Sequence, residues 1–338
     1  MNWLPRRISV VALGLIIALF LPLFINSSFV LHIVVLLCVW IVLSLSLNFV
    51  TGFAGQLALG HAAFIIIGGY AGALAMLNFG ASFWVALLIG GGCAFLSGLI
   101  LGLMSMRLRG DYLGMVTMGF AEIVRLLAVN LRGITRGPMG LPGIPRPTFF
   151  GLQFQGEAPY YYLILAFMVI TYLCIDRLLF SRFGRACLAV RDDEQAAEAM
   201  GVKSYQYKVL AFCISSLFAG FVGVFYASWI TLISPDTFTN TDSVMMSAMI
   251  TLGGIGSIFG PFIGGSVIGA IPEILRPFTN TPGFASLRLA GVGLLMVVFL
   301  ILKPSGVFGA SRQKVYLSLD TLWKLFGKKG IDPGGKQL

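Results

Sequence analysis

The chain has 338 residues, of which 58% are hydrophobic and only 11% charged, and its mean hydropathy is +0.93. A soluble domain of this length needs more polar surface to cover its core, so the composition excludes one. The net charge of +10 comes from basic residues in a few polar segments, without the continuous basic face that nucleic-acid binding requires. The chain is therefore predicted to be an all-α integral membrane protein.

Apolar segments follow one another along most of the chain, and a helix of about 20 such residues crosses a bilayer core. The predicted spans are 8–25, 29–50, 61–77, 83–104, 112–131, 159–180, 209–233, 243–255, 259–275 and 287–302. With the N-terminus inside, 17 Lys and Arg residues lie on the cytoplasmic side and five outside, as the positive-inside rule requires. We therefore predict a polytopic bundle of about 10 transmembrane helices, within a range of 8–11. It fills residues 1–305, both termini are cytoplasmic, and 306–338 form a basic cytoplasmic tail.

Two Gly-rich breaks interrupt the apolar pattern, TGFAGQLALG at 51–60 and TLGGIGSIFG at 251–260, and neither contains a charge. Such breaks are typical of interrupted or re-entrant helices, which are tolerated where the backbone lines a cavity. Merging or splitting the spans there gives the range of 8–11. Near the first break, Asn48, Gln56 and His61 are candidate residues of a substrate pathway. For His61, a role in packing is the alternative.

Glycine is abundant throughout, with 42 residues in the chain. Small residues let membrane helices approach closely. The GxxxG spacings at Gly68/Gly72 and Gly98/Gly102 therefore predict tight packing between helices. At this glycine content the spacings identify no partner helix.

Glu122 and Arg125 lie three residues apart within the predicted span 112–131. This spacing puts both side chains on one face of a helix, within hydrogen-bonding reach of each other. Ionisable groups are costly inside a membrane and tend to face the bundle interior or a water-filled path. Two interpretations stay open: a polar patch along which a zwitterion passes, or a structural ion pair that holds this helix to its neighbours.

A long polar connection at 132–158 separates two predicted spans and contains GPMGLPGIPRP. It is too polar to cross a membrane, and the predicted orientation places it on the external side. It forms either an ordered lid or docking surface or a plain connection.

The predicted cytoplasmic loop at 181–208 holds nine of the chain's 36 charged residues. Within it, RDDEQAAEAMG is predicted to form a short helix with Asp192 as N-cap and Gln195 at the reciprocal capping-box position. Glu194 in the first turn suits the positive end of the helix dipole, and Gly201 is predicted to end the helix in the left-handed conformation. The helix either docks into a groove of a soluble partner or is a solvated turn.

This segment resembles the EAA loop of ABC-transporter permeases, the coupling helix that fits a cleft in the ATPase subunit. The family pattern E-A-A-x-x-x-G aligns with Gln195, Ala196, Ala197 and Gly201, with Gln195 in place of Glu. Other stretches are similar to the LivM-type permeases of branched-chain amino acid importers, and together they cover most of residues 40–275 in the family's order. These stretches are Leu45–Tyr70, Arg107–Arg125, Gly137–Pro145, Gly184–Phe212 and Ile233–Pro261.

The resemblance implies a permease subunit that moves branched-chain or related amino acids across the bacterial inner (cytoplasmic) membrane. It implies as partners two ABC ATPase subunits, a homologous second permease, a periplasmic or extracellular substrate-binding protein and the lipid bilayer. The chain contains no Walker A sequence, so ATP hydrolysis has to come from separate subunits and the permease is not an enzyme. The implied coupling helix comprises Arg191, Asp192, Glu194, Gln195, Ala196, Ala197, Glu198 and Gly201.

The residues also bear on other classes of function. No constellation of catalytic side chains shares a face, and five scattered cysteines with two histidines predict no metal site, so no cofactor is expected. Two alternatives stay open, an ABC permease for urea or short amides and an ion-coupled secondary transporter. The second favours unpaired carboxylates inside the membrane, whereas Glu122 has Arg125 beside it.

Overall fold

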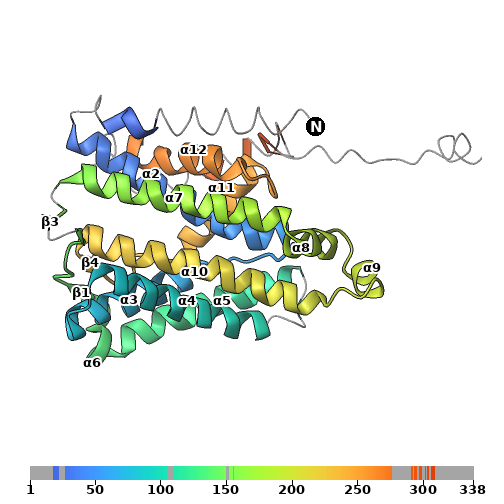
Figure 1. Cartoon of the computed structure of the whole chain (residues 1–338), viewed down its shortest axis with the longest axis horizontal. Helices are drawn as coiled ribbons and strands as arrows, with labels where there is room; N and C mark the ends of the chain where they lie inside the picture. The colour runs from blue at the N-terminus through green and yellow to red at the C-terminus, as the bar shows by residue number, and fades with distance from the viewer. Residues whose placement is uncertain are drawn as a thin grey trace, which may run out of the picture.

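The structure is a computed structural model that describes residues 18–22, 27–104, 108, 110–149, 152–154, 156–275 and scattered positions between 291 and 308. The described helices lie roughly side by side along one axis (Figure 1). The α-helices are α2 (Ser28–Asn48), α3 (Ala62–Phe79), α4 (Phe83–Met104), α5 (Asp111–Asn130), α6 (Arg132–Thr135), α7 (Glu157–Phe180), α8 (Arg182–Asp192), α9 (Glu194–Ala199), α10 (Ser204–Ile230), α11 (Asn240–Gly253) and α12 (Gly260–Leu275). The remaining elements are the π-helix η1 (Phe49–Phe53), the 3-10 helix η3 (Gly137–Met139) and the strands β1 (Leu141–Pro142), β2 (Thr148–Phe149), β3 (Leu152–Gln153) and β4 (Leu232–Ile233).

Six helices in the described part of the chain are long and apolar enough to cross a membrane. They are α2 continued by η1, α3, α4, α5, α7 and α10, and each matches one of the predicted spans. The predicted spans 243–255 and 259–275 correspond to α11 and α12, which have only 14 and 16 residues. The predicted spans 8–25 and 287–302 lie largely outside the described residues. The all-α membrane fold is therefore supported, while the number of about ten spans and the side of the termini stay predictions.

The centre of the bundle is α10, which packs most extensively against α3 and α4. Glycines make this packing close: a Cβ atom on Gly68 would lie 2.4 Å from the Cα of Gly220, and one on Gly90 would lie 2.5 Å from the carbonyl oxygen of Gly68. The prediction of tight helix packing from the GxxxG spacing at Gly68 is therefore confirmed.

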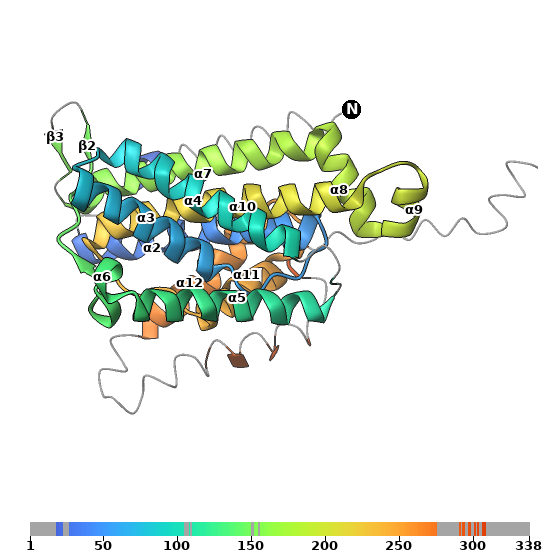
Figure 2. The same cartoon turned by 90° about the horizontal axis from the view of Figure 1, so that it is seen from below.

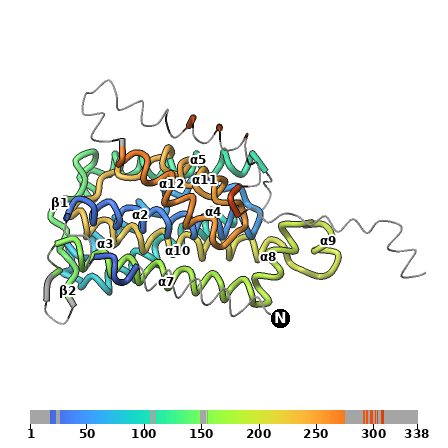
Figure 3. The backbone as a smooth tube through the Cα atoms, turned by 90° about the horizontal axis from the view of Figure 1, so that it is seen from above, coloured from blue at the N-terminus to red at the C-terminus, as the bar shows by residue number. Residues whose placement is uncertain are grey.

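The second Gly-rich break turns the chain between α11 and α12. A Cβ atom on Gly253 would lie 2.0 Å from the oxygen of Gly260, and one on Gly264 would lie 1.7 Å from the oxygen of Met249. The two helices therefore form an antiparallel hairpin, which packs on α2 (Figure 3). The close contact between α11 and α12 at Gly253 and Gly264 leaves no room for a Cβ atom and therefore depends on glycine.

The two ends of the bundle differ. At one end, α8 and α9 extend beyond the other labelled helices; at the opposite end lie α6 and the short strands (Figure 2). The predicted external loop 132–158 belongs to this opposite end, where β1 pairs with β4 through Leu141 and Ile233. Backbone amides of Gly143 and Ile144 also donate to the carbonyl of Thr231. The described part of the loop is thus ordered by contact with the segment that follows α10.

Candidate functional site

The charged segment 181–208 folds into two short helices rather than one. Ser181 begins α8 by accepting a hydrogen bond from the amide of Gly184, and the helix continues through Asp192. Asp193 is extended and caps α9, since its Oδ1 accepts from the amide of Ala196 at 3.0 Å. The prediction that Asp192 caps the helix is therefore wrong by one residue, and Gln195 does not stand at the capping-box position, which Ala196 occupies. Because α8 already includes Arg191 and Asp192, the next acidic side chain takes the capping position.

The C-terminal end of α9 is a Schellman motif, in which two amides turn back to helix carbonyls. The amide of Gly201 donates to the oxygen of Glu198 at 2.9 Å, and that of Val202 donates to the oxygen of Ala197 at 3.0 Å. Gly201 has φ +85°, in the left-handed region that favours glycine. The prediction for Gly201 is confirmed.

Polar contacts fix α9 against the start of α10. The Lys208 ammonium lies 2.6 Å from a carboxylate oxygen of Glu194, and the two side chains are only 9% and 20% exposed. The hydroxyl of Ser204 donates to the Glu198 carboxylate. Both acidic side chains of α9 therefore bond residues at the start of α10, although Glu198 stays exposed.

The exposed residues of α9 are uncharged except for Glu198. Gln195, Ala196 and Ala199 are exposed, whereas Ala197 is buried. Met200, which follows directly, is 85% exposed. Met200 was not among the residues predicted from the sequence, although an apolar residue next to the glycine that ends a polar helix was a signal for a contact surface.

Arg191 points back toward the bundle. Its Nη1 donates to the carbonyl of Gly52 in η1 at 2.9 Å, and its Nη2 lies 3.0 Å from Oδ1 of Asp192. The Arg191 side chain is 32% exposed and that of Asp192 is 62% exposed. Arg191 therefore connects the charged segment to the first Gly-rich break.

The candidates beside the first break are buried and engaged within the protein. Asn48 donates through Nδ2 to the carbonyl of Ser257 at 2.8 Å and accepts through Oδ1 from the amide of Gly256. His61 is 1% exposed, with Nε2 2.8 Å from the hydroxyl of Ser46. Gln56 is also buried. For His61, these contacts are those of a packing residue.

Glu122 and Arg125 form the expected pair on α5, with Nη2 of Arg125 2.6 Å from Oε1 of Glu122. Two residues that were not predicted from the sequence complete the cluster. Nη1 of Arg125 lies 2.9 Å from Oδ1 of Asp236, and Nδ2 of Asn240 lies 3.2 Å from Oε2 of Glu122. The predicted contact is confirmed, and the cluster joins α5 to the segment between α10 and α11.

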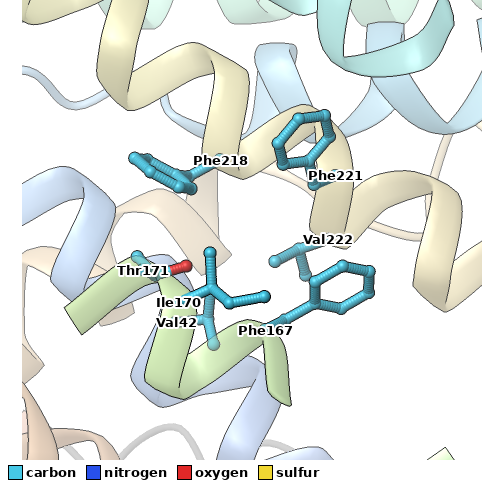
Figure 4. Close-up of a pocket in the computed structure, with 7 residues that line it drawn as sticks. All are labelled: Val42, Phe167, Ile170, Thr171, Phe218, Phe221 and Val222. Carbon is cyan, nitrogen blue, oxygen red and sulfur yellow. The ribbon is translucent and has the colours of Figure 1, made fainter. Parts of the chain in front are cut away.

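An apolar pocket of about 150 Å³ lies between α2, α7 and α10 (Figure 4). The residues that line it are Val42, Phe167, Ile170, Thr171, Phe218, Phe221 and Val222. Among the described residues that line the pocket, Thr171 alone has a polar side-chain group, so these residues offer no partners for the ammonium and carboxylate groups of an amino acid. Within the described residues, no three His, Cys, Asp or Glu side chains gather in a way that could hold a metal ion.

These features define a multi-pass helical membrane protein with a short, doubly capped helix at one end and a bundle of apolar spans behind it. Residues 29–301 match the family described as branched-chain amino acid transport system / permease component, and the chain belongs to that family. It is 36% identical to the high-affinity branched-chain amino acid transport system permease protein LivM of Escherichia coli, over 92% of this chain and 77% of the relative.

Two further similarities are lower. The autoinducer 2 import system permease protein LsrC of Yersinia enterocolitica is 26% identical over 63% of this chain and 58% of its own length. Among solved structures, a chain of PsaBC from Streptococcus pneumoniae in complex with Fab aligns with a TM-score of 0.47 and 16% identity. That alignment covers 86% of this chain and 98% of the other.

Proposed function

We propose that this chain is the transmembrane permease subunit of an ATP-driven importer of branched-chain amino acids in the bacterial inner membrane. Its similarity to LivM over 92% of the chain supports the substrate class. In this proposal the complex also contains two ABC ATPase subunits, a second homologous permease and a substrate-binding protein. The permease supplies the path, and the ATPases supply the energy.

The observation that carries the proposal is the construction of α9. The helix projects from one end of the bundle (Figure 1) and is capped at both ends. The Lys208–Glu194 ion pair holds it against α10, while Gln195, Ala196, Ala199 and Met200 face outward. These four uncharged side chains suit the centre of a contact with an ATPase subunit, and the exposed Glu198 then lies among the polar groups at its rim.

The same proposal sets the orientation. The end that carries α8 and α9 faces the cytoplasm, in agreement with the positive-inside rule for Arg182, Arg185 and Arg191. The loop 132–158 then faces outward, where the substrate-binding protein delivers its cargo.

For the path itself, the Glu122–Arg125 cluster is the best candidate. Glu122 and Arg125 have side chains 41% and 29% exposed on a helix that is long and apolar enough to span the membrane. Charged groups in that position are costly against lipid, so we propose that the second permease or water covers this face of α5. With Asp236 included, the cluster carries two acidic groups and one basic group, which favours the ammonium group of a passing amino acid.

The test of the proposed function is reconstitution of the chain with its ATPases, second permease and binding protein in proteoliposomes. We expect leucine uptake that requires ATP and continues in the presence of an uncoupler. Uptake by this chain alone, or uptake abolished by the uncoupler, would instead indicate an ion-coupled secondary transporter. Uptake of urea or a short amide in place of leucine would show the alternative cargo.

The docking role of α9 is tested by Gly201→Pro, with Gly156→Pro as matched control. Both glycines have positive φ, and at both a Cβ atom would meet no other atom within 4 Å, but they lie at opposite ends of the bundle. Proline fixes φ near −65° and, at 201, removes the amide that bonds Glu198. We expect Gly201→Pro to insert normally and to lose transport and ATPase copurification, whereas Gly156→Pro keeps copurification. Normal transport by Gly201→Pro would refute the docking role.

A further inference from the structure

The side chain of Arg191, a residue of α8, contacts the C-terminal end of a membrane-spanning helix. The last carbonyls of any helix have no donor within it, and positive charge is favourable there because of the helix dipole. The helix formed by α2 and η1 ends at Phe53, and its Gly52 carbonyl accepts from Nη1 of Arg191 at 2.9 Å. Arg191 lies three residues before α9, so one side chain joins the segment that carries α9 to the end of this span.

Glycines leave the space that the Arg191 side chain fills. A Cβ atom on Gly55 would lie 2.7 Å from Cγ of Arg191, and one on Gly256 would lie 2.9 Å from its Nη1. Gly55 belongs to the first break and Gly256 to the second, and both have positive φ, at +70° and +76°. The guanidinium therefore lies where the two Gly-rich breaks meet.

The breaks also contact each other directly. The Asn48 side chain, 1% exposed, bonds the Gly256 amide and the Ser257 carbonyl, at 3.1 and 2.8 Å. A Cβ atom on Gly52 would lie only 2.5 Å from the nitrogen of Gly256. A displacement of one break at this junction therefore has to displace the other, since packed backbone leaves no free volume.

The far end of the first break rests on α5. The amide of Leu59 donates to Oγ1 of Thr117 at 2.9 Å, and a Cβ atom on Gly60 would lie 1.9 Å from the carbonyl oxygen of Thr117. The same helix carries Glu122 and Arg125. Contacts are thus continuous from α8 through Arg191 and the first break to the candidate pathway.

We propose that Arg191 is a positioning residue that transmits the movement of α9 to the junction of the two breaks and from there to α5. The proposal rests on the proposed function, because it takes α9 as the helix that the ATPases move. The π-helix η1, where Arg191 bonds, is the part of this span suited to change, since π-turns occur in short pieces and frequently at functional sites. A continuous set of contacts that includes an element able to change its arrangement provides a physical route for coupling between two sites.

The test compares Arg191→Ala, Arg191→Lys and Arg185→Ala in the reconstituted complex, with leucine transported per ATP hydrolysed as the readout. Arg185 is a matched control, because its Nη1 also donates to a backbone carbonyl, that of Phe180, but outside the breaks. We expect Arg191→Ala to retain its ATPase subunits and to lose at least tenfold in transport per ATP. Arg191→Lys, which keeps one donor for Gly52, should recover part of the loss, and Arg185→Ala should resemble the wild type.

A double-mutant cycle with Asn48→Ala tests whether both residues act through the junction. The double variant should transport as much leucine per ATP hydrolysed as the single variant with the lower value. Three results would overturn the proposal: wild-type coupling by Arg191→Ala, a loss of transport that only follows lost ATPase subunits, or independent effects of Arg191→Ala and Asn48→Ala.

A second measurement does not depend on the cargo. Spin labels at Leu57 in the first break and at Leu232 near the opposite end report the movement of the break on trapping with ATP and vanadate. We expect a distance change in the wild-type complex and none in Arg191→Ala, and an equal change in both would overturn the proposal. If the expected difference appears while the wild-type complex transports no leucine, the substrate assignment fails and the role of Arg191 is supported.

Discussion

The substitution Gly90→Ala tests how closely the central helices pack, with Gly92→Ala as its control two residues away on α4. A Cβ atom at Gly90 would lie 2.3 Å from Cγ2 of Val224 and 2.5 Å from the carbonyl oxygen of Gly68. At Gly92 no atom lies within 4 Å. The two substitutions change helix propensity equally and differ only in what the new methyl group meets.

The magnitude follows from these distances. Ordinary contacts begin near 3.4 Å, so α3 has to move away from α4 by about 1 Å in Gly90→Ala. Overpacking of this kind lowers the free energy of unfolding by about 1–3 kcal/mol, and the better helix propensity of alanine raises it by about 1 kcal/mol. We therefore expect Gly90→Ala to lose up to about 2 kcal/mol and Gly92→Ala to gain up to about 1 kcal/mol.

The assay is thermal unfolding in detergent, followed by the fraction of monodisperse protein that remains after heating. Gly90→Ala should unfold several degrees below the wild type, and Gly92→Ala at the wild-type temperature or above. The reasoning is refuted if the two variants unfold at the same temperature, because the contact between α3 and α4 then does not limit stability.

Two further predictions concern other parts of the bundle. Glu157→Ala should lower thermal stability by about 1 kcal/mol, because the Glu157 carboxylate accepts from Nε1 of Trp229 at 2.8 Å; Glu157→Gln, which keeps an acceptor, should lose less, and equal losses would contradict this account. Burial raises the pKa of the Cys187 thiol to about 12, so the reactive thiolate is scarce until the pH approaches that value. In the folded protein at pH 7.5, N-ethylmaleimide should therefore leave Cys187 intact and modify it only after unfolding, as mass spectrometry of the labelled chain would show; equal modification of Cys187 in the folded and unfolded protein would contradict this account.

The apolar spans and the end of α9 were predictable from the sequence because local rules decide them. Six predicted spans are helices long and apolar enough to cross a membrane, since length and hydropathy suffice for that assignment. Gly201 adopts the left-handed conformation because a helix that ends there favours the one residue without a Cβ atom. The start of α9 was misplaced by one residue, since Asp192 and Asp193 are equally good caps and the preceding helix α8 decides between them.

The tertiary partners were not predictable from local patterns. Asp236 lies 111 residues from Arg125, and Gly52 lies 139 residues from Arg191. No periodicity connects such positions, and only the folded bundle brings them together. The sequence showed two uncharged Gly-rich breaks but not that they are in contact. A glycine pattern indicates that another segment packs closely, but it does not identify that segment.

The charged segment is therefore best understood as part of the bundle and not as an appended loop. It is attached at two places: Arg191 bonds the end of η1, and the Glu194–Lys208 pair fixes α9 to α10. A solvated turn that only separated two spans would gain little from burying a lysine to 9% exposure, since desolvation of the ammonium group opposes it. Two attachments to different helices instead make α9 a rigid extension of the bundle, so that a force applied to its outward face reaches both α10 and the junction of the breaks.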